Sequence, residues 1–443
     1  MAESECNGEI KLAGVDFISS LPDAILQQIL SCFPTKIAIR TSVLSKRWKH
    51  VWRETPRLSF DCHRADHLSS IKKTLSSYSA LKLTSFDVSI GDDISETQFD
   101  EWIEFAMSRN AENLSLECSR DDYRVPDFFY HNSSVKQLSV TLRYYTDMNP
   151  KCSVSWPSLR SLSLTRCCLS DGSLASILSG CPTLETLILN LCEEPHHLDL
   201  SNSPNLKRLE INNQNREPGE IVAPHIHYLR LTTRYGPYTL VDVSSLTEAN
   251  FNISNFWHRI LKADFLGDII MLKILAKLQN IERLTIGARV LQILTLAEIR
   301  GLTFPQLKIK ALTVETTIVR SVVPGIVRLL RSSPGLKKIT VCTMECRAIP
   351  VTEFDGYLDA QGLNPDQCWM GFFPAVDVKS EHVALFMELV LWNAKTLETV
   401  VLRLGGYLSE TEYQKLLPML SRYMNGRKHS RANAVLNSFA IIP

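Results

Sequence analysis

The sequence has almost no excess charge of either sign. Its 48 lysine and arginine residues are matched by 47 aspartate and glutamate residues, which leaves a formal net charge of +1 at pH 7. Proteins that bind nucleic acid or anionic membranes non-specifically carry a broad positive surface. The charge balance therefore argues against both classes of partner and restricts any binding of polyanions to a local patch.

Long apolar runs are also missing. No apolar stretch approaches the roughly 18 residues that a membrane-spanning helix needs. The first residues, MAESECNGEIKL, are acidic and polar, unlike a secretory or transit signal. We therefore expect a cytoplasmic or nuclear protein with no membrane partner. Disulfide bonds are rare in those reducing compartments.

Cysteine is not scarce, but its spacing lacks any metal-binding pattern. The chain has 12 cysteines and no C-x-x-C pair. Cys342 and Cys346 are four residues apart, yet no second pair of Cys or His follows at a ligand spacing. We interpret the cysteines as small buried packing residues and expect no metal and no cofactor.

The common catalytic and nucleotide-binding signatures are absent as well. The sequence contains no G-x-x-x-x-G-K-[ST], G-x-G-x-x-G, G-x-S-x-G or H-E-x-x-H. His196 and His197 lie in a polar loop, where a solvated pair is the ordinary interpretation. A general acid would need burial or a close partner to shift its pKa, and the paired acidic residues lie in turn-like segments. No residue therefore favours an enzyme.

What is present is enough apolar material for a large folded protein. Apolar residues make up 45% of the 443 residues, which suits two or three domains. We expect a disordered tail at 1–15, a helical module at 16–61, a repeat region at 62–345, an insertion or loop at 346–380, a last repeat with a C-terminal cap at 381–425, and a mobile tail at 426–443.

Three short helical patterns follow one another between Ser19 and Trp52. The first places apolar residues on one helical face: Leu21, Ile25, Leu26, Ile29 and Leu30. Thr35 and Ser45 can cap the second and third helices. The third helix should bury one side, formed by Trp48, Val51 and Trp52. A strand is predicted directly afterwards, at Pro56–Asp61.

So short a module cannot bury its large apolar side chains alone, because about forty residues make too small a core. One interpretation is a helical cap whose apolar face packs on the following domain. The other is a docking module for another protein, because apolar stripes with aromatic anchors suit helix-in-groove recognition. The periodicity does not choose between these two interpretations.

Downstream of the module, an L-x-x-L-x-L unit recurs along the chain. Its last two apolar positions are the pairs Phe86/Val88, Leu114/Leu116, Leu138/Val140, Leu162/Leu164, Leu187/Leu189, Leu209/Ile211, Leu229/Leu231, Leu284/Ile286, Leu312/Val314, Ile339/Val341 and Val400/Leu402. The regular units advance by roughly 20–28 residues, the period of a leucine-rich repeat.

The spacing within each unit predicts a strand. Two apolar residues two positions apart point to the same side of a strand, and one unit cannot bury that side, so the units should stack into a parallel sheet. Helical patterns occur between strands, at Phe99–Met107, Leu174–Leu178, Ile269–Leu278, Val322–Leu330 and His382–Trp392. We therefore predict an α/β fold, a βα solenoid with a parallel sheet on its concave face and helices on its convex side.

Some features of the repeats are irregular. The gaps between Leu231 and Ile281 and between Val341 and Leu397 indicate insertions or degenerate units. The segment 346–380 has no repeat and is predicted to be a long loop or an edge hairpin. Polar or sulfur-bearing residues shortly after several strands should satisfy backbone groups at the turns: Cys167, Asn190, Cys192 and Asn212.

The N-terminal module also resembles a known family. The order L-P-D-x-I-L-x-x-I-L, then P-T-K-x-A-x-R-T-S-V-L-S-K-R-W, then V-W, resembles the F-box of plant F-box/leucine-rich-repeat proteins and extends from Phe17 to about Asp61. Ile37 departs from the family, whose members often carry an acidic residue at this position. The C-terminal region is similar to the FBD type of the same family.

This resemblance implies a function. It implies that the F-box binds a Skp-type adaptor and, through it, a cullin and a RING protein. The chain would then be the non-catalytic substrate-recognition subunit of an SCF-type ubiquitin ligase. By residue match, the adaptor contacts would be Leu21, Pro22, Ile25, Leu26, Ile29, Val43, Leu44, Ser45 and Trp48. The alternatives on the same architecture are a hormone-like small-molecule receptor and an adaptor-bound scaffold without a ligase role.

The strand residues that flank the inward positions would form the face that holds a target protein. From Arg208 onward a basic residue recurs there: Arg208, Arg230, Arg283, Lys338 and Arg403. Together with Tyr228 as an aromatic anchor, these residues would form a modest positive stripe if the units stack. We hypothesise that the stripe binds an acidic or phosphorylated segment of the target. The plain alternative is a solvated face.

Overall fold

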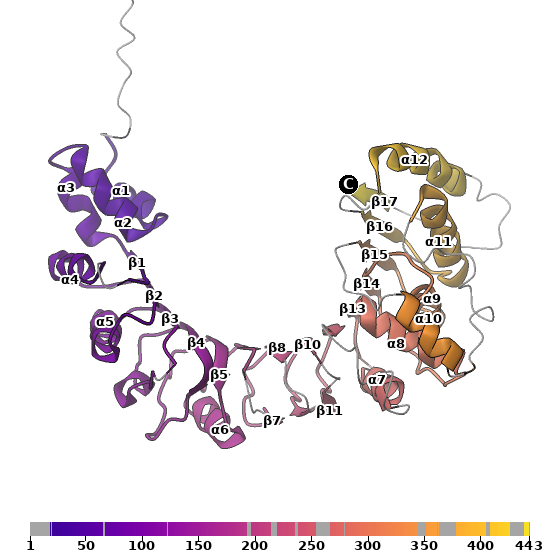
Figure 1. Ribbon diagram of the computed structural model, residues 1–443, viewed down its shortest axis with the longest axis horizontal. Coiled ribbons are helices and arrows are strands. Elements are labelled where there is room, and N and C mark those ends of the chain that lie inside the picture. The colour runs from indigo at the N-terminus through magenta and orange to yellow at the C-terminus, as the bar shows by residue number, and fades with distance from the viewer. Residues whose placement is uncertain are drawn as a thin grey trace, which may run out of the picture. The chain divides into compact units, whose positions relative to one another are not determined.

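The structure is a computed structural model of the chain (Figure 1). It describes residues 18, 20–64, 67–121, 123–192, 196–213, 219–234, 238–253, 266–278, 280–343, 351–360, 362, 378–404, 408–425 and 438–442. The chain divides into two compact units, one ending at Ser119 and the other beginning at Arg120. Both units combine helices with parallel strands, which confirms the predicted α/β class.

The first unit is a helical module followed by three parallel strands. Its helices are α1 (Asp23–Ser31), α2 (Thr35–Arg40), α3 (Trp48–Val51), α4 (Leu68–Ser77) and α5 (Glu96–Ser108), with the short 3-10 helices η1 (Thr41–Val43) and η2 (Trp52–Glu54). Its strands are β1 (Arg57–Cys62), β2 (Ser85–Ile90) and β3 (Asn113–Cys118). The strand predicted directly after the module is therefore confirmed.

Polar side chains contact the helix ends of the module, although neither predicted cap holds the N-cap position. Arg47 takes that position in α3, while Ser45 Oγ accepts a hydrogen bond from the Trp48 N–H at 3.4 Å. The prediction that Thr35 caps α2 is wrong, because Pro34 takes the N-cap position with its fixed φ. Thr35 Oγ1 instead accepts a hydrogen bond from the Ser59 N–H of β1 at 2.7 Å. This contact ties α2 to the first strand.

Alternation along the strands builds the core of the first unit. Leu58, Phe86 and Leu114 occupy matching positions on β1, β2 and β3, and all three are buried. The ring of Phe60 packs against that of Phe86, with centroids 6.0 Å apart. Every second side chain of a strand thus faces the core, where it packs against the side chain at the matching position of the neighbouring strand.

The second unit repeats the same arrangement over a longer segment. Its main strands are β4 (Gln137–Asp147), β5 (Ser161–Cys168), β6 (Thr186–Asn190), β8 (Arg208–Asn213), β10 (Tyr228–Thr233), β12 (Glu248–Ile253), β13 (Arg283–Gly287), β14 (Ala311–Glu315), β15 (Lys338–Cys342), β16 (Thr399–Arg403) and β17 (Ser438–Ile442). They pair in parallel in that order. Leu162, Leu187 and Leu209 align across three neighbouring strands. The predicted parallel sheet is confirmed.

Two of these strands differ from the sequence prediction. Strand β12 lies in the first irregular gap, where Ala249 and Phe251 take the positions that leucines occupy in other units. Strand β17 pairs with β16, so that Phe439 aligns with Val400. Residues 438–442 therefore form a strand where the sequence predicts a mobile tail, while the predicted tail at 1–15 lies outside the described residues.

Helices connect most strands of the second unit: α6 (Asp171–Ser179), α7 (Leu266–Lys277), α8 (Ala288–Ile299), α9 (Val323–Arg331), α10 (Val351–Ala360), α11 (Ser380–Asn393) and α12 (Glu410–Asn425), together with the 3-10 helix η4 (Asp127–Tyr130). Helix α10 corrects the prediction of a loop or hairpin at 346–380. Apart from Gly362 and residues 378–380, the rest of that segment lies outside the described residues.

In the middle of this unit, short strands occupy the places where helices connect the strands of other repeats. They are β7 (His197–Asp199), β9 (Glu220–Val222) and β11 (Thr239–Asp242), and they form a second parallel sheet in the order β11-β9-β7. Leu198, Ile221 and Leu240 align across this sheet and are buried. Each short strand thus supplies one apolar side chain to the core where another repeat would use a helix.

The predicted turn residues satisfy polar groups in two ways. The Cys192 thiol donates to the Leu164 carbonyl at 3.3 Å, as expected of a turn residue. The Asn212 amide instead donates to Asn190 Oδ1 on the neighbouring strand at 2.7 Å. Leu191 turns the chain after β6 with a positive φ of 54°. Side-chain bonding between repeats therefore supplements the backbone pairing.

Helices α8 and α9 approach each other closely at Gly325. The Gly325 N–H donates to Thr295 Oγ1 at 3.0 Å. A Cβ atom at this position would lie 2.4 Å from the Leu291 carbonyl oxygen. Nearby, Gln292 Nε2 donates to Ser321 Oγ at 2.8 Å in the buried interior. The missing side chain at Gly325 therefore allows the two helices to hydrogen-bond.

Helix α12 is held to the start of α11 by one carboxylate. Lys415 Nζ lies 2.7 Å from Glu412 Oε1. Glu412 Oε2 accepts hydrogen bonds from the Ser380 N–H at 2.9 Å and from Ser380 Oγ at 2.8 Å. These donors, Lys415 foremost, lower the pKa of Glu412 from its ordinary 4.5 to about 2. The ionised form of Glu412 is therefore the form that holds α12.

We expect Gly325→Ala to destabilise the second unit by about 1–3 kcal/mol, as overfilling a packed core does, although alanine normally favours a helix. Urea unfolding followed by circular dichroism measures this change. Gly356→Ala in α10 is the matched control, because a Cβ there meets no atom within 4 Å, and it should be neutral or stabilising. Identical unfolding midpoints for Gly325→Ala and the wild type would contradict the close approach.

A second prediction concerns acid. Because the pKa of Glu412 is lowered by folding, its contribution to docking should be complete above about pH 4.5 and lost as the pH falls toward 2. Hydrogen exchange of the α12 amides, corrected for intrinsic rates, should accelerate over this interval. Glu412→Gln should accelerate exchange already at pH 7, whereas Glu410→Gln on the same helix should leave the acid transition in place. A transition that persists in Glu412→Gln would contradict this assignment.

Candidate functional site

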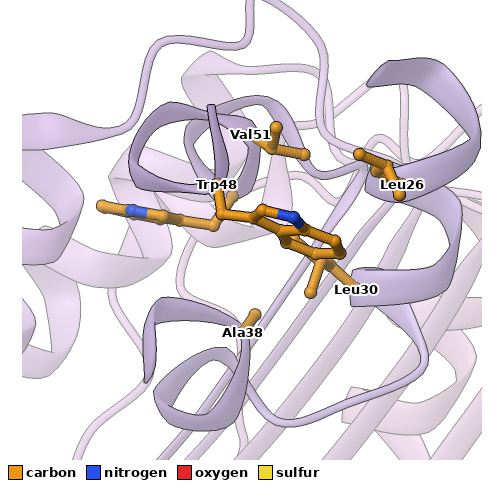
Figure 2. Packing of buried hydrophobic residues seen from close by; sticks show 6 residues of the cluster. Leu26, Leu30, Ala38, Trp48 and Val51 are labelled. Carbon is orange, nitrogen blue, oxygen red and sulfur yellow. The ribbon is translucent and has the colours of Figure 1, made fainter. Parts of the chain in front are cut away.

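The helical module has its own apolar core, shown in Figure 2. The buried residues are Leu26, Leu30, Ala38, Trp48, Val51 and Trp52, with Leu21 and Ile39 packed against them (Figure 2). Leu26 is 0% exposed and Trp48 is 8% exposed. The prediction that Leu26 and Trp48 contact an adaptor therefore needs correction, since both side chains are already covered by the module itself.

The same module leaves other large apolar side chains in contact with solvent. They are Ile18, Ile25, Ile29, Phe33, Ile37, Val43 and Leu44. They make up seven of the twelve exposed large apolar side chains in the part of the chain that the structure describes. Val43 is 87% exposed and Leu44 is 65% exposed. Such a concentration of exposed apolar side chains is typical of a protein interaction site.

An arginine fixes the segment that carries the two most exposed of these residues. Arg47 Nε donates to Asp23 Oδ1 at 2.7 Å, and the guanidinium also contacts the Leu21 carbonyl oxygen. Asp23 begins α1, so this pair holds the turn after η1 against the start of α1. Val43 and Leu44 are therefore presented by a fixed turn.

The exposure of the predicted contact residues separates them into three groups. Six are exposed: Pro22, Ile25, Ile29, Val43, Leu44 and Ser45. Leu21 is half-buried, and the remaining two are the core residues corrected above. Sequence reasoning did not propose Ile18, Phe33 and Ile37 as contacts. The signal for Phe33 was available, because it follows Ile29 by four residues and so continues the row from Ile25.

The strands of the second unit provide another surface, formed by the strand residues that lie between the buried positions and here called the open sheet face. Strand register aligns Arg208, Tyr228, Glu248 and Arg283 in one row of this face. The Arg208 guanidinium lies over the Tyr228 ring at 3.8 Å from its centroid. Burial raises the pKa of Tyr228. The predicted aromatic anchor is therefore covered in part by an arginine.

Carboxylates neutralise most of the predicted positive stripe. Arg208 lies 2.6 Å and Arg230 lies 3.9 Å from Glu210. Arg283 lies 2.6 Å from Glu248, a residue of the strand that the repeat pattern missed. The prediction of a positive stripe is thus corrected to alternating charges. Lys338 and Arg403 lie further along the sheet, in register with Ala311 and Cys342.

The histidines and acidic residues of the described ranges have structural rather than metal-binding surroundings. No group of three or more His, Cys, Asp and Glu side chains is placed to hold a metal ion in the described ranges. The backbone N–H groups of His196 and His197 donate to Asp171 Oδ1 at 2.8 Å and 3.3 Å, so the pair anchors a loop to α6. No helix in the described part of the chain has both the length and the hydropathy to cross a bilayer.

Two family models match the chain in the regions that these surfaces occupy. The model of the F-box domain matches residues 18–60, which contain α1 to η2 and most of β1. A model described as "FBD-associated F-box protein At5g56370, LRR repeats" matches residues 99–341, from within α5 into β15. The exposed apolar residues therefore belong to the F-box, and the open sheet face belongs to the repeats.

Relatives match over nearly the whole length. The chain is 50% identical over 425 residues to the F-box/LRR-repeat protein At5g02910 of Arabidopsis thaliana, covering 92% of each chain. It is 47% identical over 435 residues to the F-box/LRR-repeat protein At3g03360 of the same species, covering 93% of this chain and 90% of the relative. From its folded module, its repeats and these matches, the chain belongs to the family of F-box/LRR-repeat proteins.

Proposed function

We propose that this protein recruits a target protein to an SCF-type ubiquitin ligase, with its F-box bound to a Skp-type adaptor and its repeats bound to the target. One observation carries the adaptor half of the proposal. The F-box keeps large apolar side chains exposed although it has a complete apolar core beneath them. Exposed apolar groups of this size gain most when a partner covers them.

The adaptor-binding surface is formed by the exposed residues rather than by the whole predicted set. We assign the main contacts to Ile25, Ile29, Val43 and Leu44, with Pro22 and Ser45 at their side. Phe33 and Ile37 extend the surface. Leu26 and Trp48 support it from below, because they pack the helices on which the contact residues stand. Apolar side chains on short helices are a common means of docking into a groove.

The repeats act by holding the target near the ubiquitin that the partners deliver. Bringing two reacting groups together raises their effective concentration, so the chain needs no catalytic residues of its own. The cullin and the RING protein join through the adaptor. The open sheet face, with Arg208, Tyr228, Arg230, Arg283 and Lys338, is the proposed target-binding surface. Its alternating charges favour a target surface of complementary sign pattern over a uniformly acidic one.

One test of the proposed function measures adaptor binding. Val43→Asp/Leu44→Asp should abolish co-purification with a Skp-type adaptor and cullin, because charges would replace apolar groups in a desolvated contact. Leu81→Asp is the matched control, since Leu81 is 92% exposed but lies outside the F-box match. It should leave the complex intact. A complex that survives the double substitution, or that Leu81→Asp disrupts equally, would refute the proposed surface.

Another test separates the buried core of the F-box from its exposed surface. Trp48→Ala should lower the free energy of unfolding of the first unit by about 3–5 kcal/mol, as loss of a buried tryptophan does. Leu44→Ala should change it by about 0.5 kcal/mol or less, as expected at an exposed position. Chemical denaturation followed by tryptophan fluorescence for Leu44→Ala, and by circular dichroism for Trp48→Ala, measures both. Equal destabilisation by the two substitutions would contradict the division described here.

A further inference from the structure

The F-box segment concentrates positive charge in a chain whose total charge is balanced. Residues 18–60 contain seven lysine and arginine residues and only two acidic residues, Asp23 and Glu54. The remainder of the chain therefore carries more acidic than basic residues. Because salt screens charges beyond about 8 Å at physiological ionic strength, this local excess acts on whatever approaches the F-box rather than on the whole surface.

Both acidic side chains of the segment already have partners inside it. Asp23 Oδ1 lies 2.6 Å from Nη2 of Arg47. Glu54 Oε2 accepts a hydrogen bond from Gln27 Nε2 at 3.2 Å. The carboxylates of the F-box are therefore engaged away from most of its cations.

Four cationic side chains of the segment remain exposed, and they are here called the cationic rim: Lys36, Arg40, Lys46 and Lys49. None of them forms an ion pair with another residue in the described part of the chain. Arg57 differs, because it pairs with Asp87 of β2 at 2.7 Å. The rim therefore presents its charge to solvent.

The arrangement of Lys36 and Arg40 opposes helix formation. They lie four residues apart on α2, which has only six residues. Residues at this spacing are neighbours on the helix surface, and like charges there destabilise the helix. Carboxylates of a partner placed beside both side chains would offset this repulsion. The pair is thus better suited to a bound state than to the free protein.

The cationic rim flanks the two most exposed apolar residues of the F-box. Two rim residues lie on α2 and one lies on α3, and both helices contact η1. Val43 ends η1, and Leu44 follows it. The remaining rim residue, Lys46, comes two positions after Leu44. Positive charge therefore lies on both sides of the turn that presents Val43 and Leu44.

We propose that the cationic rim pairs with carboxylates that surround an apolar groove on the adaptor, and that this pairing accelerates association. The inference rests on the proposed function, to which it adds the charge of the partner's surface and the kinetic step on which the charge acts. Exposed ion pairs add little to the affinity of a formed complex. Complementary rim charges instead steer the encounter, so that their loss slows association.

The structure favours a protein groove over an anionic membrane surface. Helices that lie on membranes are continuous amphipathic segments with one long apolar face. Here the exposed apolar side chains come from α1, α2 and the turn after η1, and the longest of these elements has nine residues. The pair of Arg47 and Asp23 also fixes that turn. Fixed apolar side chains from separate short elements suit a shaped groove.

The experiment measures association and dissociation rates of the full-length protein with a Skp-type adaptor, by surface plasmon resonance at about 20, 150 and 500 mM NaCl. Wild-type association should slow at least about tenfold over this range, as steered association does. Lys36→Gln/Arg40→Gln/Lys46→Gln/Lys49→Gln, here called the rim variant, should associate about tenfold more slowly at the lowest salt and lose most of the salt dependence. Its dissociation rate should change less than about threefold.

Lys72→Gln/Lys73→Gln/Lys308→Gln/Lys395→Gln is the matched control. It removes the same number of exposed lysine or arginine charges, all outside the F-box match, and should associate at nearly the wild-type rate. The rim variant should unfold in urea at the wild-type midpoint or above it, because the repulsion on α2 is removed. Equal slowing in the control, or a rim variant that loses affinity only through faster dissociation, would overturn the proposal.

Two further outcomes separate this proposal from its alternatives. Wild-type protein that pellets at about 150 mM NaCl with vesicles of equal parts phosphatidylserine and phosphatidylcholine, while the rim variant does not, would assign the rim to a membrane and overturn the proposal. A wild type that binds the adaptor at a rate independent of salt overturns only the role of the rim. A wild type that binds no adaptor overturns the adaptor half of the proposed function, and the rim proposal with it.

Discussion

Each repeat of this chain has an apolar side that it cannot bury alone, and the rest of the structure follows from that constraint. A strand such as β6 turns Leu187 and Leu189 to one side and must lie beside β5 and β8 to cover them. Whether the other layer is a helix or a short strand matters less than whether it delivers an apolar side chain. This explains how β7, β9 and β11 replace helices without interrupting the main sheet.

The same parallel register that stacks apolar residues also stacks charged ones. Positions outside the core are repeated at the strand spacing, so a residue's electrostatic neighbours are set by strand order rather than by sequence distance. Arg283 meets Glu248 in this way, although 35 residues separate them. The ion pairs on the open sheet face therefore depend on which residue types occupy equivalent positions of neighbouring strands.

The sequence predicted those parts of the structure that depend on local spacing. The leucine units predicted the main-sheet strands β2 to β6, β8, β10 and β13 to β16, because apolar residues two positions apart indicate a strand with one buried side. It missed β12, where Ala249 and Phe251 replace leucines, and β17, whose partner strand gives it order. In the F-box, Ile25 and Leu26 look alike in the pattern, and only the packing of α3 makes one exposed and the other buried. Charge pairing was likewise invisible, because it depends on register.

The hydrogen bond from the Ser59 N–H to Thr35 Oγ1 joins the helical module to β1, so the folded module extends into the first strand. The family match stops at residue 60, in the middle of β1. Yet β1 is paired along its length with β2, and the Tyr78 hydroxyl donates to the Thr55 carbonyl at 2.6 Å from beyond that boundary. A fragment cut at the boundary would lose these supports. The F-box is therefore packed on the first repeats and should not be treated as a separable domain, because its contacts with β1 and with Tyr78 hold it in place.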